Sequence, residues 1–178
     1  MDTSQLELEA EDFIASYLNR RTLLIAKPKF DVLGTDLLAF SQMSDGVKFC
    51  RIQCKGRSLS NSKTSNISIP CEYVTDGFIV FLYIDTPFPE PFLYMFFPAE
   101  VRRWKKSKDN NFVLTFSLNK FESKLASYKV TDLKVKALKL FIENANVSGE
   151  FRNLVVAEIK FSMPAFTVSV DATVKDAE

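Results

Sequence analysis

Two stretches of this chain are the most informative, Gly34-Thr35-Asp36-Leu37-Leu38 and Arg51-Ile52-Gln53-Cys54-Lys55-Gly56. Side chains alternate between the two faces of an extended strand, so Gln53 and Lys55 point the same way if their segment is a strand. If Asp36 lies on the neighbouring paired strand, a carboxylate, a carboxamide and an ammonium group meet at one place. Hard cations take oxygen ligands and a phosphodiester attracts a cation, so this trio suits a divalent metal ion and a phosphodiester.

Length and composition favour one domain. The chain has 178 residues, of which 47% are hydrophobic, enough for one well-buried core and too few for two. Helical and strand-like segments alternate, so we expect a single α/β or α+β domain over residues 1–178. No run of about 18 apolar residues is present, which argues against a membrane span. The acidic start, residues 1–11, lacks the apolar core of a signal peptide, so we expect a cytoplasmic protein.

The chemistry available to the chain is narrow, because it contains no histidine. This excludes Ser-His-Asp and Cys-His nucleophile systems and histidine-based zinc sites. No Gly-x-Gly-x-x-Gly or Walker-type phosphate loop occurs. Cys50 and Cys54 would lie roughly 13 Å apart on a strand, too far for a disulfide, and their spacing is poor for zinc. We expect both, and Cys71, to be reduced and mostly buried. Any catalyst must therefore use carboxylates, lysine and metal.

Hydrophobic periodicity and turn signals predict the order of elements. An Asp-Gly turn between two strand-like runs predicts a β-hairpin, and a nearly continuous apolar run over 77–85 predicts a central strand buried on both faces. We expect a helix over 5–20 capped by Thr3 or Ser4, a strand over 23–26, hairpin strands over 35–40 and 48–55, a mobile loop over 56–66, strands over 77–85 and 92–97, a helix from Pro98 through Trp104, a strand over 112–118, a helix from a Thr131 or Asp132 cap to Ile142, and two strand-like runs over 154–174.

In this order of elements the chain resembles the PD-(D/E)xK nuclease superfamily, and most closely small endonucleases with a Gln-x-Lys motif. The resemblance rests on five segments, in this order: Thr35-Asp36-Leu37, Arg51-Ile52-Gln53-Cys54-Lys55, Ser58-Leu59-Ser60, Asp76-Gly77-Phe78-Ile79-Val80 and Phe97-Pro98-Ala99-Glu100-Val101-Arg102. It covers about residues 5–105. It implies a restriction-endonuclease-like α/β fold, a central mixed β-sheet flanked by helices. The nuclease-like core would span about residues 5–118, followed by a C-terminal helix and β extension over 131–174.

The resemblance also implies a role for each motif residue. Asp36 would be the principal ligand of Mg²⁺ or Mn²⁺, and Gln53 would offer its side-chain carbonyl as a second. Lys55 would activate the attacking water or stabilise the charge that develops on phosphorus. A glutamate of the first helix would reach the metal, Glu11 in the first place and Glu7 as the fallback. The backbone carbonyl of Cys54 would be a further ligand.

One departure from the superfamily bears on activity, because Gln53 stands where a glutamate or aspartate is usual. A neutral amide leaves less negative charge to hold the ion. The implied function is a metal-dependent DNA endonuclease, with a possible homodimer in which residues 154–174 join two copies. Two alternatives stay open, an inactive nucleic-acid-binding module of the same fold and a protein-interaction domain. A purely structural alternative makes Asp36 a turn residue and leaves Gln53 and Lys55 facing solvent.

Net charge is +1, which is low for a dedicated nucleic-acid binder, so only a local patch can supply phosphate contacts. The segment 102–108 contains five cations around one aromatic residue. We expect Trp104 to pack onto the core rather than to stack on a base. The candidate DNA-contacting cations are Arg102, Arg103, Lys105 and Lys106 in this segment, with Arg51, Arg57 and Lys63 as a positive rim around the motif.

Overall fold

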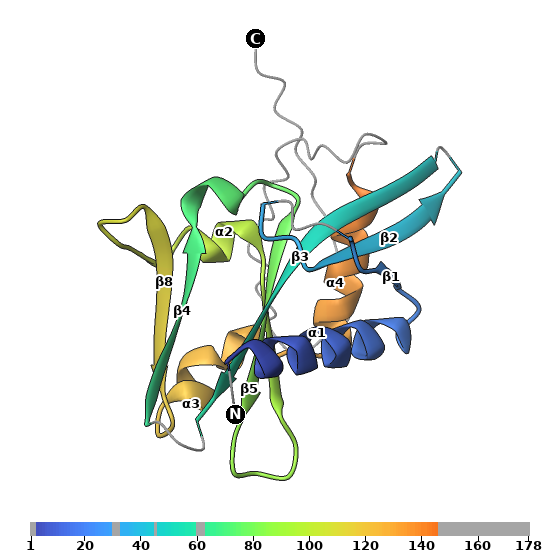
Figure 1. Cartoon of the computed structure of the whole chain (residues 1–178). Coiled ribbons are helices and arrows are strands. Elements are labelled where there is room, and N and C mark those ends of the chain that lie inside the picture. Colours follow the sequence, from blue (N-terminus) through green and yellow to red (C-terminus); the bar gives the residue numbers. More distant parts are fainter. Residues whose placement is uncertain (1–2, 30–32, 45, 60–62, 146–178) are drawn as a thin grey trace, which may run out of the picture.

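The computed structural model shows a mixed α/β protein, and it describes residues 3–29, 33–44, 46–59 and 63–145. The predicted strand-like runs over 154–174 lie outside these residues. The elements along the chain are α1 (Thr3–Asn19), β1 (Leu24–Ala26), β2 (Leu37–Met43), β3 (Gly46–Ser58), β4 (Thr64–Pro70), the 3-10 helix η1 (Cys71–Tyr73), β5 (Phe78–Asp85), β6 (Phe92–Phe96), α2 (Pro98–Val101), β7 (Lys105–Lys106), β8 (Asn111–Ser117), α3 (Phe121–Leu125), the 3-10 helix η2 (Ala126–Tyr128) and α4 (Asp132–Glu143) (Figure 1).

The strands form two sheets. The larger has the order β1-β2-β3-β5-β6 and the smaller the order β4-β8-β7. In the larger sheet β3 and β5 are parallel, whereas the other neighbouring pairs are antiparallel. The chain passes from β3 to β5 through β4, which belongs to the smaller sheet, so this excursion replaces the helix that usually connects parallel strands. The larger sheet is therefore mixed, as the resemblance predicted.

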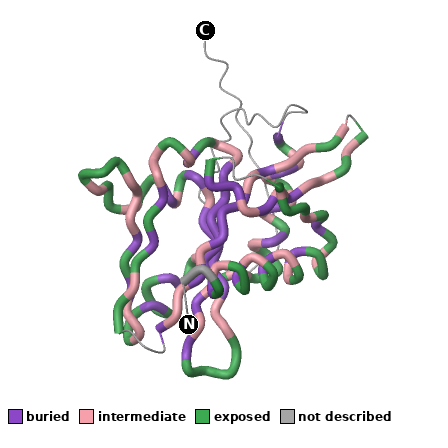
Figure 2. Tube along the Cα trace, in the orientation of Figure 1, coloured by how far each residue is buried: buried purple, intermediate pink, exposed green. Residues whose placement is uncertain are grey.

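A hydrophobic core lies on each face of the larger sheet, and together the two cores bury β5 on both sides (Figure 2). On one face Ile79 and Phe81 pack with α1 and α4. On the other face Val80 and Leu82 pack with the smaller sheet, α2 and α3, and these residues form the second core. The alternation of side chains along a strand divides the residues between the two cores. The prediction of a central strand over 77–85 is confirmed.

The ends of the helices follow local chemistry. Helix α4 begins after Thr131, whose hydroxyl accepts a hydrogen bond from the Lys134 backbone N–H at 3.2 Å, so the predicted cap is confirmed. Helix α1 begins at Thr3, and the side chains of Thr3 and Ser4, the expected caps, are not among those that the structure describes. At its other end Thr22 has a φ of 65°, and the Leu23 N–H bonds to the Leu18 carbonyl, which is the usual left-handed helix stop. None of the described helices is long and apolar enough to span a membrane.

Two predictions are wrong in their bounds. The segment 56–66 is not one long loop, because β3 continues to Ser58 and β4 starts at Thr64. The polar composition of this segment predicted a loop, although its last residues begin strand β4. In β4 the side chains of Ile67 and Ile69 point inward and the polar residues that alternate with them face outward. The helix opened by Pro98 ends at Val101 rather than Trp104, since the chain turns there into β7. Helix α3 was not predicted. The hairpin of β2 and β3 is confirmed.

Candidate metal site at the start of strand β2

Asp36 lies just before β2, at the point where this strand ends its pairing with β3. Leu37 pairs with Ile52, and the Asp36 N–H donates to the Ile52 carbonyl at 2.9 Å. Beyond Ile52 the edge of β3 has no further partner in β2. There Asp36 Oδ2 accepts a hydrogen bond from the Cys54 N–H at 2.6 Å. The Asp36 carboxylate therefore extends the ladder and lies against the peptide group between Gln53 and Cys54.

Gln53 is buried rather than exposed to solvent, with only 6% of its surface accessible. Its register with Val80 of the parallel strand β5 puts the side chain on the face that carries the second core. Within the described part of the chain, Gln53 Oε1 and Thr35 Oγ1 are buried side-chain atoms with no hydrogen-bond partner. The alternative in which Gln53 simply faces solvent is thus wrong, and a buried acceptor without a protein partner is usually satisfied by a water molecule, an ion or a ligand.

Gly34 explains how the Gln53 amide fits. Its φ is +66°, and a Cβ built on it would lie 2.6 Å from the Tyr73 ring and 2.8 Å from Gln53 Nε2. A side chain at this position would displace one or both neighbours. Glycine is needed here for both the backbone conformation and the space.

Lys55 lies on the same face of β3 as Gln53, since it pairs with Leu82 two residues further along β5. Its side chain is 18% exposed, and its Nζ is 3.7 Å from Glu7 Oε1 on α1. Arg57 Nη1 contacts the same Glu7 oxygen at 3.1 Å, and its Nε donates to the Asn66 carbonyl at 2.8 Å. Glu7, the fallback ligand, therefore contacts two cations, Lys55 and Arg57.

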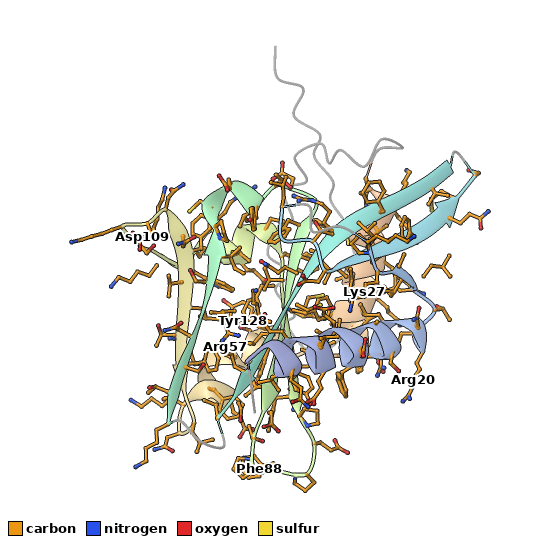
Figure 3. The ribbon with its side chains drawn as sticks, in the orientation of Figure 1. Arg20, Lys27, Arg57, Phe88, Asp109 and Tyr128 are labelled. Carbon is orange, nitrogen blue, oxygen red and sulfur yellow. The ribbon has the colours of Figure 1, made fainter. Side chains whose placement is uncertain are left out.

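Glu11, the preferred helix ligand, forms an ion pair with Lys27, with 2.5 Å between Glu11 Oε2 and Lys27 Nζ. The Glu11 hydrogen bond raises the pKa of Lys27 above its usual value, and the negative charges of Asp12 and Asp36 add to this effect. Glu11 and Asp36 therefore act on one cation. In Figure 3 Lys27 and Arg57 both lie beside α1, Arg57 toward its N-terminal end.

Lys27 was missed by sequence reasoning. It follows β1 directly, and Ala26 pairs with Leu38 of β2, which carries Lys27 toward Asp36. Only the strand register reveals this proximity.

Cys54 contributes its backbone alone. Its thiol faces the core beneath α1, and burial, followed by the nearby Asp36 and Glu11 charges, raises its pKa well above the usual value. The N–H and C=O of one strand residue point toward the same edge. The Cys54 carbonyl therefore points to the edge occupied by Asp36, where the resemblance placed a ligand. No group of three His, Cys, Asp or Glu side chains in the described residues forms a metal-binding cluster.

The predicted cationic rim separates into two sets. Arg51 donates to the Tyr73 carbonyl at 3.2 Å and to the Thr75 hydroxyl at 2.7 Å, and burial lowers its pKa. Arg102 pairs with Asp76 at 2.7 Å, and Arg57 binds Glu7. All three arginines are therefore engaged in contacts within the fold. The second set, which is exposed, consists of Lys63, Arg103, Lys105 and Lys106. Trp104 packs edge-on against Phe96 with 5.0 Å between ring centroids, so its predicted role in the core is confirmed.

Comparison with known proteins adds no relative: neither the known protein families nor the curated proteins contain a match to this chain.

Proposed function

We propose that the protein is a restriction-endonuclease-like, cytoplasmic, metal-dependent DNA endonuclease that hydrolyses phosphodiester bonds. The observation that carries this proposal is Gln53 Oε1, a buried acceptor without a partner in the described residues, on the strand segment that binds Asp36. Leaving such a group unpaired costs about 1–3 kcal/mol. A cation bound beside Asp36 would satisfy it.

The donor set fits Mg²⁺ or Mn²⁺, because it consists of oxygens. Asp36 and the Gln53 side-chain carbonyl would hold the ion, together with the Cys54 backbone carbonyl and Glu11. Glu11 would have to leave Lys27 to do so. When bound, the ion supplies stabilisation of the charge that develops on a phosphodiester during hydrolysis.

The protein's own residues supply position and charge. The Cys54 N–H fixes one Asp36 oxygen at 2.6 Å, which limits the carboxylate to one orientation. Lys55 would bind a phosphate oxygen of the substrate and compensate its charge in the transition state. Glu7 is a positioning residue in this scheme, because it contacts both Lys55 and Arg57. Cutting both strands of a duplex would be achieved by a homodimer.

A second candidate function is supported by the small number of carboxylates. Gln53 is neutral and the described residues hold no cluster of three acidic, cysteine or histidine ligands. The same fold without the ion would serve as a nucleic-acid-binding module that does not cut.

Cleavage of a supercoiled plasmid in Mn²⁺ tests the proposal. Wild type should nick and linearise the plasmid, whereas Asp36→Ala and Lys55→Ala should each lose about 100-fold or more in rate, as expected for charge stabilisation in a transition state. Lys136→Ala on α4 is the matched control and should cut like wild type. Equal residual nicking by all four proteins would indicate a contaminant and refute the proposal.

A further inference from the structure

The hairpin formed by β7 and β8 concentrates positive charge at one end of the smaller sheet. Arg103, Lys105, Lys106 and Lys108 are all exposed, and Asp109 at the tip is the one acidic residue of the segment 103–110. Figure 3 shows Asp109 at the outer edge of the molecule, on the loop between β7 and β8. The β7–β8 hairpin is therefore strongly basic, although the net charge of the whole chain is only +1.

These cations have no internal role that the structure shows. Arg102, their neighbour in sequence, pairs with Asp76 and donates to the Val74 carbonyl. Among the residues described, none of the four hairpin cations forms an ion pair. Like charges repel one another, so an opposite charge outside the described chain would stabilise these four cations, which lie within six residues of sequence.

The hairpin is already ordered. Trp104 anchors its base against Phe96. The Ser107 N–H bonds to the Asn111 carbonyl at 2.8 Å, and the Asn111 N–H bonds to the Ser107 hydroxyl at 3.2 Å. Asn110 takes the turn with a φ of 57° and accepts a hydrogen bond from the Cys71 N–H. A preformed element loses little conformational freedom when it binds, which favours a binding role.

We propose that the β7–β8 hairpin is a preformed arm that binds the phosphate backbone of double-helical DNA. This inference rests on the proposed function for its choice of DNA, but binding by the arm requires neither metal nor catalysis. Lys105 and Lys106 are both exposed and lie on β7, the edge strand of the smaller sheet, so they can contact the phosphates of a DNA backbone that runs along this edge.

The composition of the hairpin favours a nucleic acid over a protein or membrane partner. Lysine is depleted in protein interfaces, whereas DNA interfaces are rich in positive charge. The aromatic residues of the hairpin, Trp104 and Phe112, pack toward the second core. The exposed surface of the hairpin therefore has cations and no large apolar side chain to bury in a protein interface or a bilayer.

Fluorescence anisotropy with a labelled DNA duplex in EDTA tests the arm over 50–200 mM salt. The triple variant Lys105→Gln, Lys106→Gln, Lys108→Gln should bind at least about tenfold more weakly at low salt, and the slope of log K against log salt should decrease by about 2–3 in magnitude. The matched control removes three exposed lysines near the opposite end of β8 and on α4, through Lys120→Gln, Lys124→Gln and Lys136→Gln, and should retain most of the affinity and the slope.

Three results would overturn the arm: an unchanged slope in the hairpin variant, an equal loss in the control variant, or a poly-glutamate peptide that binds wild type as tightly as the duplex does. The last would indicate an acidic protein partner. Asp36→Ala separates this inference from the proposed function, because it should bind the duplex like wild type without cutting it. If Asp36→Ala cuts like wild type, the catalytic proposal fails while the arm stands. All six substitutions are at exposed positions, and thermal unfolding checks that both variants fold.

Discussion

Replacing Gly34 by alanine should destabilise the protein substantially. The residue has a φ of +66°, and the added Cβ would lie 2.6 Å from the Tyr73 ring and 2.8 Å from the Gln53 amide nitrogen. A left-handed conformation costs an alanine about 1–2 kcal/mol, and overpacking a filled site costs about 1–3 kcal/mol. We therefore expect a loss of about 2–5 kcal/mol, a large part of the roughly 5–15 kcal/mol that holds a typical domain together.

Urea denaturation followed by Trp104 fluorescence measures this loss, with an unchanged m-value as the sign that the unfolded state is unaffected. A Tyr73→Ala background helps to separate the two causes, because removing the ring relieves its share of the crowding and leaves the backbone strain and the contact with Gln53. Gly34→Ala should then cost at least about 1 kcal/mol less than in wild type. A loss below about 1 kcal/mol in the wild-type background would refute both the strain and the crowding.

Three further results follow from single contacts. Lys27→Met should tighten Mn²⁺ binding several-fold in calorimetry, because it removes the cation that competes for Glu11; weaker or unchanged binding would contradict this. Thr131→Ala should lower the unfolding free energy by about 0.5–2 kcal/mol through the lost helix cap, and a change below this range in urea would show that the cap contributes little. A thiol reagent at pH 8 should modify Cys71 quickly and the two other cysteines only after unfolding, because both are fully buried with raised pKa values; modification of all three in the native protein would argue against the packing of β3.

Strong local patterns predicted the larger sheet. The apolar run of β5 and the Asp-Gly signal before β3 each determine their own structure through burial and turn geometry. Strand β4 was not predicted, because its polar residues are typical of a loop. Its two inward isoleucines are buried only because the smaller sheet packs on the second core. Pairing between β4 and β8 joins residues far apart in the chain, and no local signal specifies such a pairing.

The candidate site was predictable in part. The shared face of Gln53 and Lys55 follows from the period of a strand, and the position of Asp36 opposite them follows from the hairpin register. Which oxygen each group reaches does not follow, because that depends on the neighbours across the fold. Lys27 lies beside Glu11 because β1 pairs with β2, and Arg51 donates hydrogen bonds to Tyr73 and Thr75 in the segment before β5.

Titration calorimetry with Mn²⁺ tests the central claim, an ion held by Asp36 and Gln53, most directly. Wild type should bind the ion, Asp36→Ala should abolish the binding heat, and Gln53→Ala should weaken it. Asp109→Ala is the matched control, since it removes an exposed carboxylate at the tip of the β7–β8 hairpin. Loss of binding in Asp36→Ala alongside full binding in Asp109→Ala is the predicted result. Absence of binding to wild type, or equal binding by Asp36→Ala, would contradict the metal site.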